Sequence, residues 1–296
     1  MTTASHAMDR QAAVLGGGAI LFSQASLNLG AALGKHLFPV VGAEGVAALR
    51  VGLAAVLLLA ILRPWRSPVG RGHVGSLLLY GTTMGMMSLF IYQAIARIPI
   101  GVATAIEVTG PLSIVLLNSR RPLDFLWLGA AVLGLALLLP LDTSKALDPL
   151  GVAFACGAAT CWALYVVSAR KVSGPLGNRA VAWGMLVAAL IALPFGAARA
   201  GASLFEPRIV ATGLVVAVLS SVMPYLIEIV AMNRLTASVV GLSLGAAPAA
   251  GALVGFLVLG ERLLPIQGVA ILCIIGASVG CALASSWSRQ TDIDAR

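Results

Sequence analysis

The sequence predicts an all-α integral membrane protein with ten transmembrane helices in two inverted five-helix repeats. The first observation is composition: 59% of the 296 residues are hydrophobic, only 10% are charged, and the mean hydropathy is +1.00. A soluble domain carries about 25% charged residues, so this chain cannot cover a surface that faces water. The second observation is a series of apolar stretches of about 20 residues, the length that crosses a bilayer as a helix. The third is a motif that occurs once in each half of the chain.

Each apolar stretch ends at a charged or a Pro/Gly-rich break, and these breaks give the expected boundaries. The ten expected spans are residues 12–33, 45–62, 74–96, 99–118, 123–140, 150–169, 180–198, 208–231, 236–258 and 265–285. The aromatic residues do not follow the alternating period of a membrane barrel, which favours helices. Gln24, Ser26 and Asn28 interrupt the first stretch, so we expect a permanent span there and not a cleaved leader.

The net charge of +8 follows from the expected topology. With the N-terminus in the cytoplasm, the cytoplasmic segments hold 12 of the 19 Lys and Arg residues and the outer segments hold 7. Cytoplasmic loops of membrane proteins collect these residues. Both termini are therefore expected in the cytoplasm, and the positive charge requires no nucleic-acid partner.

The repeated motif consists of a turn, an apolar helix and a proline. It spans Ala94–Pro111 and again Ala231–Pro248, with an arginine and the final proline at matching positions. Residues 1–141 and 142–296 would each contain five spans, so the second half enters the membrane in the opposite sense. Inverted repeats are typical of secondary transporters, whose solute site lies near the middle of the membrane between the repeats. Interrupted helices in corresponding positions point to such a site, and here they are the fourth and ninth.

Two carboxylates fall inside expected spans, Glu107 in the fourth and Glu228 in the eighth. An ionised carboxylate in hydrocarbon costs at least a few kcal/mol, so it is usually neutralised, paired or hydrated. Our hypothesis is that Glu107 exchanges a proton for the ammonium group of a substrate. The alternative is a structural polar residue bonded to a neighbouring helix, and for Glu228 the two interpretations stay equally open.

Other polar residues are placed where they could line a solute path. Gln24 and Asn28 lie four residues apart on one face of the first helix, either as interhelical hydrogen-bonding groups or as a cavity wall. Lys35 and Arg50 could attract a substrate carboxylate or could extend to the membrane interface. The candidate substrate- and proton-binding residues are therefore Glu107, Glu228, Gln24, Asn28, Tyr92, Tyr225, Lys35 and Arg50, and the candidate helix breaks for gating are Pro111 and Pro248.

Several function classes receive no support from the sequence. The four cysteines lie inside apolar stretches and the three histidines lie outside them, with no spacing that suits a metal. An intramembrane enzyme would need a Ser–His, histidine-rich or paired-acid arrangement at membrane depth. We therefore expect neither an enzyme nor a cofactor. A passive channel or a structural subunit stays open, and the sequence gives no signal of oligomeric state.

Stretches across nearly the whole chain resemble the EamA-type transporters of the drug/metabolite transporter superfamily, and among them the bacterial threonine and homoserine exporters. The stretches are G-K-H-L-F-P-V-V-G and A-L-R within 34–50, E-V-T-G-P at 107–111, S-R-R-P-L-D-F at 119–125, C-W-A-L-Y at 161–165 and L-G-E at 259–261. The resemblance implies efflux of a small zwitterionic amino acid across the bacterial inner membrane by proton antiport. Export of other small metabolites or drugs is the alternative. One position departs: close family members carry an acid where this chain has Ala247.

Overall fold

The computed structural model describes residues 2–66, 69–117, 122–138, 147–232, 237–277 and 279, and these residues form helices and no strand. The all-α prediction is confirmed. The helices are α1 (Thr2–Lys35), α2 (Phe38–Leu62), α3 (Val74–Ile95), α4 (Ile100–Glu107), α5 (Thr109–Leu117), α6 (Pro122–Leu138), α7 (Pro149–Leu176), α8 (Arg179–Ala200), α9 (Pro207–Ala217), α10 (Met223–Met232), α11 (Ala237–Leu259) and an unlabelled helix over Pro265–Ala277. Short helical turns are η1 (Pro64–Arg66), η2 (Arg71–His73), η4 (Gly201–Phe205) and η5 (Val218–Val222).

Five helical segments within the described residues are long and apolar enough to cross a membrane. They are Phe38–Leu62, Val74–Ile95, Pro149–Val172, Arg179–Phe205 and Pro207–Ile227. Shorter apolar helices cover Ile100–Ile114, Ala247–Leu259 and Pro265–Ala277. By length and composition these helices can cross a membrane, as predicted, while the count of ten spans and the two inverted repeats remain predictions.

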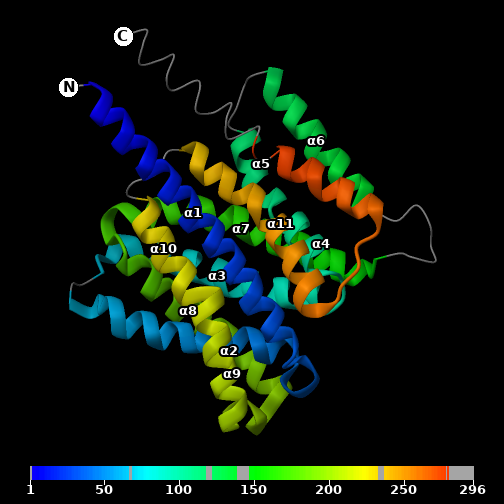
Figure 1. Cartoon of the computed structure of the whole chain (residues 1–296). Helices are drawn as coiled ribbons and strands as arrows, with labels where there is room; N and C mark the ends of the chain where they lie inside the picture. The colour runs from blue at the N-terminus through cyan, green and yellow to red at the C-terminus, as the bar shows by residue number, and fades with distance from the viewer. Residues whose placement is uncertain are drawn as a thin grey trace.

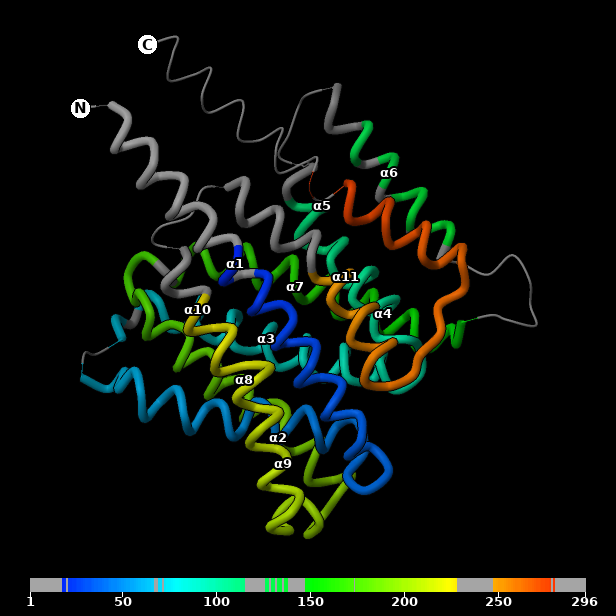
Figure 2. The backbone as a smooth tube through the Cα atoms, in the orientation of Figure 1, coloured from blue at the N-terminus to red at the C-terminus, as the bar shows by residue number. Residues whose placement is uncertain are grey.

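Helices from both halves of the chain interleave around the centre of the protein. In Figure 1, α1 crosses the molecule diagonally, with α10 along one side and α11 along the other, and it contacts both. Helix α2 packs mainly on α8, and α3 packs on α7 and α8. Helix α4 lies against α11 and α7, as the tube in Figure 2 also shows. Helices α1, α2, α3, α4 and α7 are therefore all part of the packed centre of the protein.

Glycines allow two of these helix pairs to approach closely. A Cβ atom at Gly30 of α1 would lie 2.8 Å from Cβ of Ser220 in η5. A Cβ atom at Gly101 of α4 would lie 2.7 Å from Cα of Ala252 in α11. Small residues at such contacts let helices pack tightly in membranes without a hydrophobic driving force. Both pairs join the first half of the chain to the second.

The fourth predicted span is interrupted beside Glu107. Helix α4 ends at Glu107, Val108 lies outside both helices, and α5 begins at Thr109. Pro111 has no backbone N–H, so it cannot bond to the carbonyl of Glu107 one turn earlier. The interruption near Pro111 is confined to Val108, whose backbone angles stay helical (φ −65°, ψ −18°) and whose N–H bonds to the carbonyl of Thr104 at 3.0 Å, and Glu107 is the last residue of α4.

The expected break at Pro248 is not present. Helix α11 continues through Pro248 from Ala237 to Leu259. A proline inside a membrane helix is tolerated where neighbouring groups satisfy the nearby carbonyls. Next to this proline, the side-chain amide of Asn28 on α1 donates to the carbonyl of Ala247 at 3.4 Å, which ties α11 to α1.

A second interruption, which the sequence analysis did not predict, lies between α9 and α10. Residues Val218–Val222 form a π-helical turn in which the N–H of Met223 bonds to the carbonyl of Val218. In an α-helix the carbonyl of Leu219 would accept from the N–H of Met223, which is already bonded to Val218. In a π-helix it would accept from residue 224, but Pro224 has no N–H. Ser26 on α1 donates to this carbonyl at 2.7 Å. The turn therefore presents free backbone acceptors to neighbouring helices.

Candidate functional site

A cavity lies where the central helices meet, and its described lining includes one cationic and one anionic side chain. The space between its lining atoms amounts to about 860 Å³, part of it open to solvent. Its lining consists of Gln24, Leu27, Asn28, Ala31, Arg50, Met87, Ile91, Tyr92, Ile95, Ile100, Thr104, Glu107, Trp162, Tyr165, Pro224, Tyr225 and Ala247. These residues come from α1, α2, α3 and α4 in the first half of the chain and from α7, α10 and α11 in the second half.

Arg50 is held inside the protein by the π-helical turn. Its side chain is only 7% exposed. Its Nε donates to Oγ of Ser221 at 2.8 Å, and its Nη2 donates to the carbonyl of Ser220 at 2.9 Å. Pro224 cannot bond to that carbonyl, which explains why it is available to the guanidinium. Arg50 therefore lies in the cavity wall and does not extend to the membrane interface.

The guanidinium of Arg50 keeps donors for a further partner. A guanidinium has five N–H groups, and two of them are used by the turn. Its Nη1 has no hydrogen bond to any residue that the structure describes, and its central carbon lies 5.6 Å from the centre of the Tyr92 ring. An arginine fork with free N–H groups is well suited to a carboxylate. The anchored side chain thus offers a fixed anion site.

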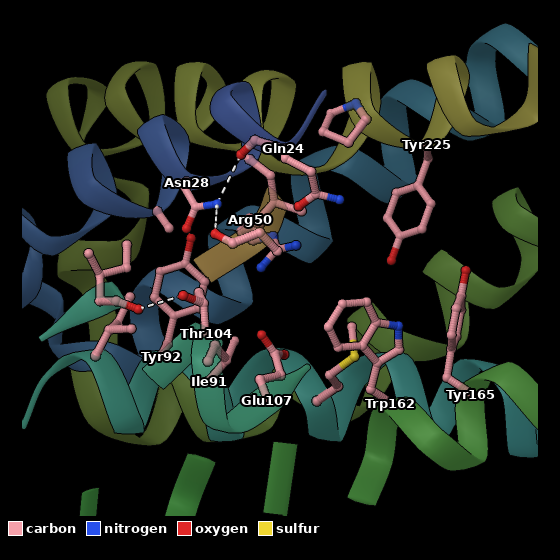
Figure 3. Close-up of a pocket in the computed structure, with 17 residues that line it drawn as sticks. Gln24, Asn28, Arg50, Ile91, Tyr92, Thr104, Glu107, Trp162, Tyr165 and Tyr225 are labelled. Atoms are coloured by element: carbon pink, nitrogen blue, oxygen red, sulfur yellow. Dashed lines mark hydrogen bonds between the residues drawn. The ribbon is translucent and has the colours of Figure 1, made fainter. Parts of the chain in front are cut away.

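Glu107 lies across the cavity from Arg50. In Figure 3 its carboxylate points into the open space below the guanidinium. Within the described part of the chain, this carboxylate accepts no hydrogen bond, and no Lys, Arg or His nitrogen lies within 4.0 Å of it. An unpaired carboxylate at membrane depth is costly, so it requires a proton or a cation. The geometry therefore provides a cation site opposite the anion site.

Neutral polar groups fill the end of the cavity next to α1. Asn28 donates to the backbone carbonyl of Gln24 at 2.9 Å, and both residues line the cavity. The hydroxyl of Thr104 donates to the carbonyls of Ile100 and Gly101, at 2.9 and 3.1 Å. The interpretation of Gln24 and Asn28 as cavity wall is the one that the structure favours, although Asn28 also links α1 to α11.

The opposite end of the cavity is aromatic. Trp162, Tyr165 and Tyr225 surround it in Figure 3, with Tyr225 on the side of Arg50 and Trp162 beside Glu107. The ring of Tyr165 stacks on Tyr80, with ring centres 5.0 Å apart. Tyr225 was a predicted site residue. The sequence analysis does not assign Trp162 or Tyr165 to a site, because one helix by itself does not show which side faces a cavity.

Five of the eight predicted binding residues line the cavity together with Glu107, whereas the side chain of Lys35 lies elsewhere. The five are Gln24, Asn28, Arg50, Tyr92 and Tyr225. Glu228 has its backbone in α10, and its side chain lies outside the described residues. Ala247, the position at which the resemblance leads one to expect an acid, does line the cavity.

Lys35 is bound elsewhere. Its Nζ lies 2.6 Å from Oε1 of Glu261, in the loop after α11. The other oxygen of Glu261 accepts from the backbone N–H of Ile100 at 2.9 Å, the first residue of α4. The Glu261 carboxylate therefore joins the end of α1, the start of α4 and the loop that follows α11. It balances both a cation and the positive end of a helix dipole.

We expect Glu261→Gln to destabilise the protein by about 1–2 kcal/mol, because it removes one charge-assisted pair and weakens the bond at the start of α4. Thermal unfolding in detergent should show a Tm lower by about 2–6 °C. The matched control is Glu206→Gln, since Glu206 is an exposed carboxylate at the start of α9 with no side-chain bond to that helix end. Equal Tm values for the two variants would contradict the structural role of Glu261.

Known proteins resemble this chain over nearly its whole length. Residues 149–283 match the EamA-like transporter family. The threonine/homoserine exporter RhtA of Escherichia coli (strain K12) is 44% identical over 266 residues, which cover 89% of this chain and 90% of that exporter. RhtA of Salmonella typhimurium (strain LT2) is 43% identical over 265 residues, with the same coverage.

A solved crystal structure supports the same assignment at the level of fold. It superposes with a TM-score of 0.61 at 19% identity, covering 94% of this chain and 97% of the other. The curated relatives are named as exporters, which agrees with the expectation that the chain is not an enzyme. Their similarity confirms the resemblance drawn from the motifs. The chain, a helical membrane protein with a charged central cavity, belongs to the EamA-like transporter family.

Proposed function

We propose that the protein exports threonine, homoserine and similar small amino acids across the bacterial inner membrane. The observation that carries this proposal is that Arg50 and Glu107 line the same central cavity without forming a salt bridge. A zwitterionic amino acid presents a carboxylate and an ammonium group, which complement these two side chains. The names of relatives that are 44% identical supply the substrate class.

The substrate carboxylate would bind the free N–H groups of Arg50, and the ammonium group would bind Glu107. Trp162 and Tyr225 border the same space and exclude water around the bound molecule. Exclusion of water strengthens both charge interactions, because the local dielectric falls. An ion or an apolar drug would leave at least one of the two charges unpaired, which disfavours a passive ion channel and a drug exporter.

Coupling to protons would follow from the unpaired carboxylate of Glu107. Glu107 cannot stay charged and empty in the cavity without a large cost. A proton entering from outside would displace the ammonium group, and departure of that proton to the cytoplasm would prepare Glu107 for the next substrate. One carboxylate thus serves two cations in turn, which is the requirement for antiport.

The proposed topology has ten spans, with residues 1–141 and 142–296 as inverted repeats and both termini in the cytoplasm. The excess of Lys and Arg in the expected cytoplasmic segments supports this orientation. The family match at 149–283 falls within the proposed second repeat. The break between α4 and α5 at Pro111, and Pro248 within α11, are the places where the repeats would bend during alternating access.

Growth of a threonine-sensitive strain tests this function. Cells that express the protein should grow at threonine or homoserine concentrations that stop the same strain carrying an empty vector. Resistance to unrelated toxic dyes should not change, which separates amino-acid export from drug efflux. Equal sensitivity to both amino acids with and without protein in the membrane would contradict the proposal.

A further inference from the structure

Two buried polar atoms in the cavity wall form no hydrogen bond to any residue that the structure describes. They are Oδ1 of Asn28 and the hydroxyl of Tyr92, on residues that are 1% and 0% exposed; the side chains of Ser220 and Arg50 lie near that hydroxyl but without the geometry of a hydrogen bond. Ser23, Ser88 and Trp183 also carry such atoms among the described residues, but these three do not line the cavity. A buried polar atom without a partner costs about 1–3 kcal/mol, so its presence in a cavity indicates a missing ligand.

The amide of Asn28 has a fixed orientation. Its Nδ2 donates to two backbone carbonyls, those of Gln24 at 2.9 Å and Ala247 at 3.4 Å. Because carbonyls only accept hydrogen bonds, the NH₂ group must face them, and Oδ1 must face away. A Cβ atom at Gly251 would lie 3.0 Å from Oδ1, so the absence of a side chain at Gly251 keeps this oxygen uncovered on that side.

The ring of Tyr92 is fixed as well. Phe38 packs against it edge-on with ring centres 6.1 Å apart, and the Arg50 guanidinium lies over its face at 5.6 Å. Gly34 of α1 allows close contact, since a Cβ atom there would lie 3.2 Å from Cε1 of Tyr92. Figure 3 shows the Tyr92 hydroxyl at the same end of the cavity as the side-chain oxygen of Asn28.

We propose that Asn28 and Tyr92 form a subsite for the side-chain hydroxyl of the transported amino acid. One atom is an acceptor and the other is a donor, and a hydroxyl supplies the complement of both. The Tyr92 O–H donates to the substrate oxygen, and the substrate O–H donates to Oδ1 of Asn28. This inference rests on the proposed function, in which Arg50 and Glu107 bind the two charged groups and leave the side chain at this end.

The subsite makes the transporter discriminate against amino acids of equal size without a hydroxyl. In valine, a methyl group replaces the hydroxyl of threonine. Bound valine would leave both protein atoms unpaired, and sites built to bond a hydroxyl reject such analogues strongly. We therefore expect threonine to be transported at least about tenfold better than valine at equal concentrations.

The test measures the ratio of initial rates for labelled L-threonine and L-valine in inside-out vesicles. Tyr92→Phe removes only the hydroxyl, and Asn28→Leu removes the amide with little change of volume. Each variant should lower the threonine-to-valine ratio by about fivefold or more. The ratio does not depend on the amount of folded protein. The matched control is Ser88→Ala, which removes a buried, unpartnered hydroxyl outside the cavity lining and should keep the wild-type ratio.

Unchanged ratios in both variants, or an equal change in Ser88→Ala, would overturn the subsite. Calorimetry on the purified wild-type protein needs no variant: threonine should bind at least about tenfold more tightly than valine. Equal affinities with intact threonine transport would overturn the subsite and leave the proposed function standing. Wild-type vesicles that carry neither amino acid would overturn both.

Discussion

Replacing Glu107 with glutamine is expected to abolish threonine export driven by a pH gradient. Glutamine has nearly the same shape, but it cannot take up or release a proton and cannot balance an ammonium charge. Among the described residues, the cavity lining contains no acid besides Glu107. We expect gradient-driven uptake into inside-out vesicles to fall to the level of vesicles without the protein.

The controls separate coupling from damage to the fold. Glu206→Gln removes an exposed carboxylate at the start of α9 and should transport as the wild type does. Glu107→Asp keeps the titratable group on a shorter chain, so it should retain part of the activity. Since glutamine lacks the charge that costs energy in the cavity, the Glu107→Gln protein should be at least as stable as the wild type. Undiminished gradient-driven transport in Glu107→Gln would refute the role of this residue.

The fold class could be predicted from the sequence because membrane helices leave a strong local signal. Apolar stretches near 20 residues, the charge asymmetry of the loops and the scarcity of charged residues each depend on the solvent and not on distant contacts. The two charged cavity residues carried a signal as well, since an ionisable group in an apolar stretch demands an explanation. For Glu107 that signal pointed to the cavity directly.

The position of the Arg50 side chain could not be predicted from the neighbouring sequence. Near the start of an apolar stretch, an arginine can extend to the interface or face inward, and the sequence allowed both. Its position is decided by the carbonyl of Ser220, 170 residues away, which is free because a π-helical turn precedes Pro224. Nothing near Arg50 in the chain reports that contact. The same holds for Lys35, whose partner Glu261 lies 226 residues away.

The helix breaks show a similar limit. Proline indicates where a backbone donor is missing, but neighbouring groups decide whether the helix ends. At Pro111 the helix is interrupted, whereas α11 continues through Pro248 with Asn28 bonded beside it. Pro224 carried the same local signal as the other two. It is linked to a π-helical turn whose free carbonyls bind Ser26 and Arg50.

Replacing Arg50 with methionine is expected to reduce threonine transport by about 100-fold or more, because the substrate carboxylate would enter a cavity without a cation. Truncating one partner of a buried, hydrogen-bonded charge pair costs about 2–5 kcal/mol. Arg50→Lys keeps the charge but loses the planar fork, so it should recover only part of the activity. The measurement is the initial rate of labelled threonine uptake in inside-out vesicles, at equal amounts of protein.

Arg50 also fastens α2 to the π-helical turn, so structure and binding must be separated. Ser221→Ala removes the acceptor of the Nε hydrogen bond while the guanidinium stays in the cavity. This variant should lower thermal stability and keep most of the transport, whereas Arg50→Met should lose transport at any stability. Arg208→Met removes an exposed arginine and serves as the charge-matched control. Equal transport losses in Ser221→Ala and Arg50→Met would mean that Arg50 acts only as a structural link. A loss confined to Arg50 would identify the guanidinium as the group that holds the substrate carboxylate.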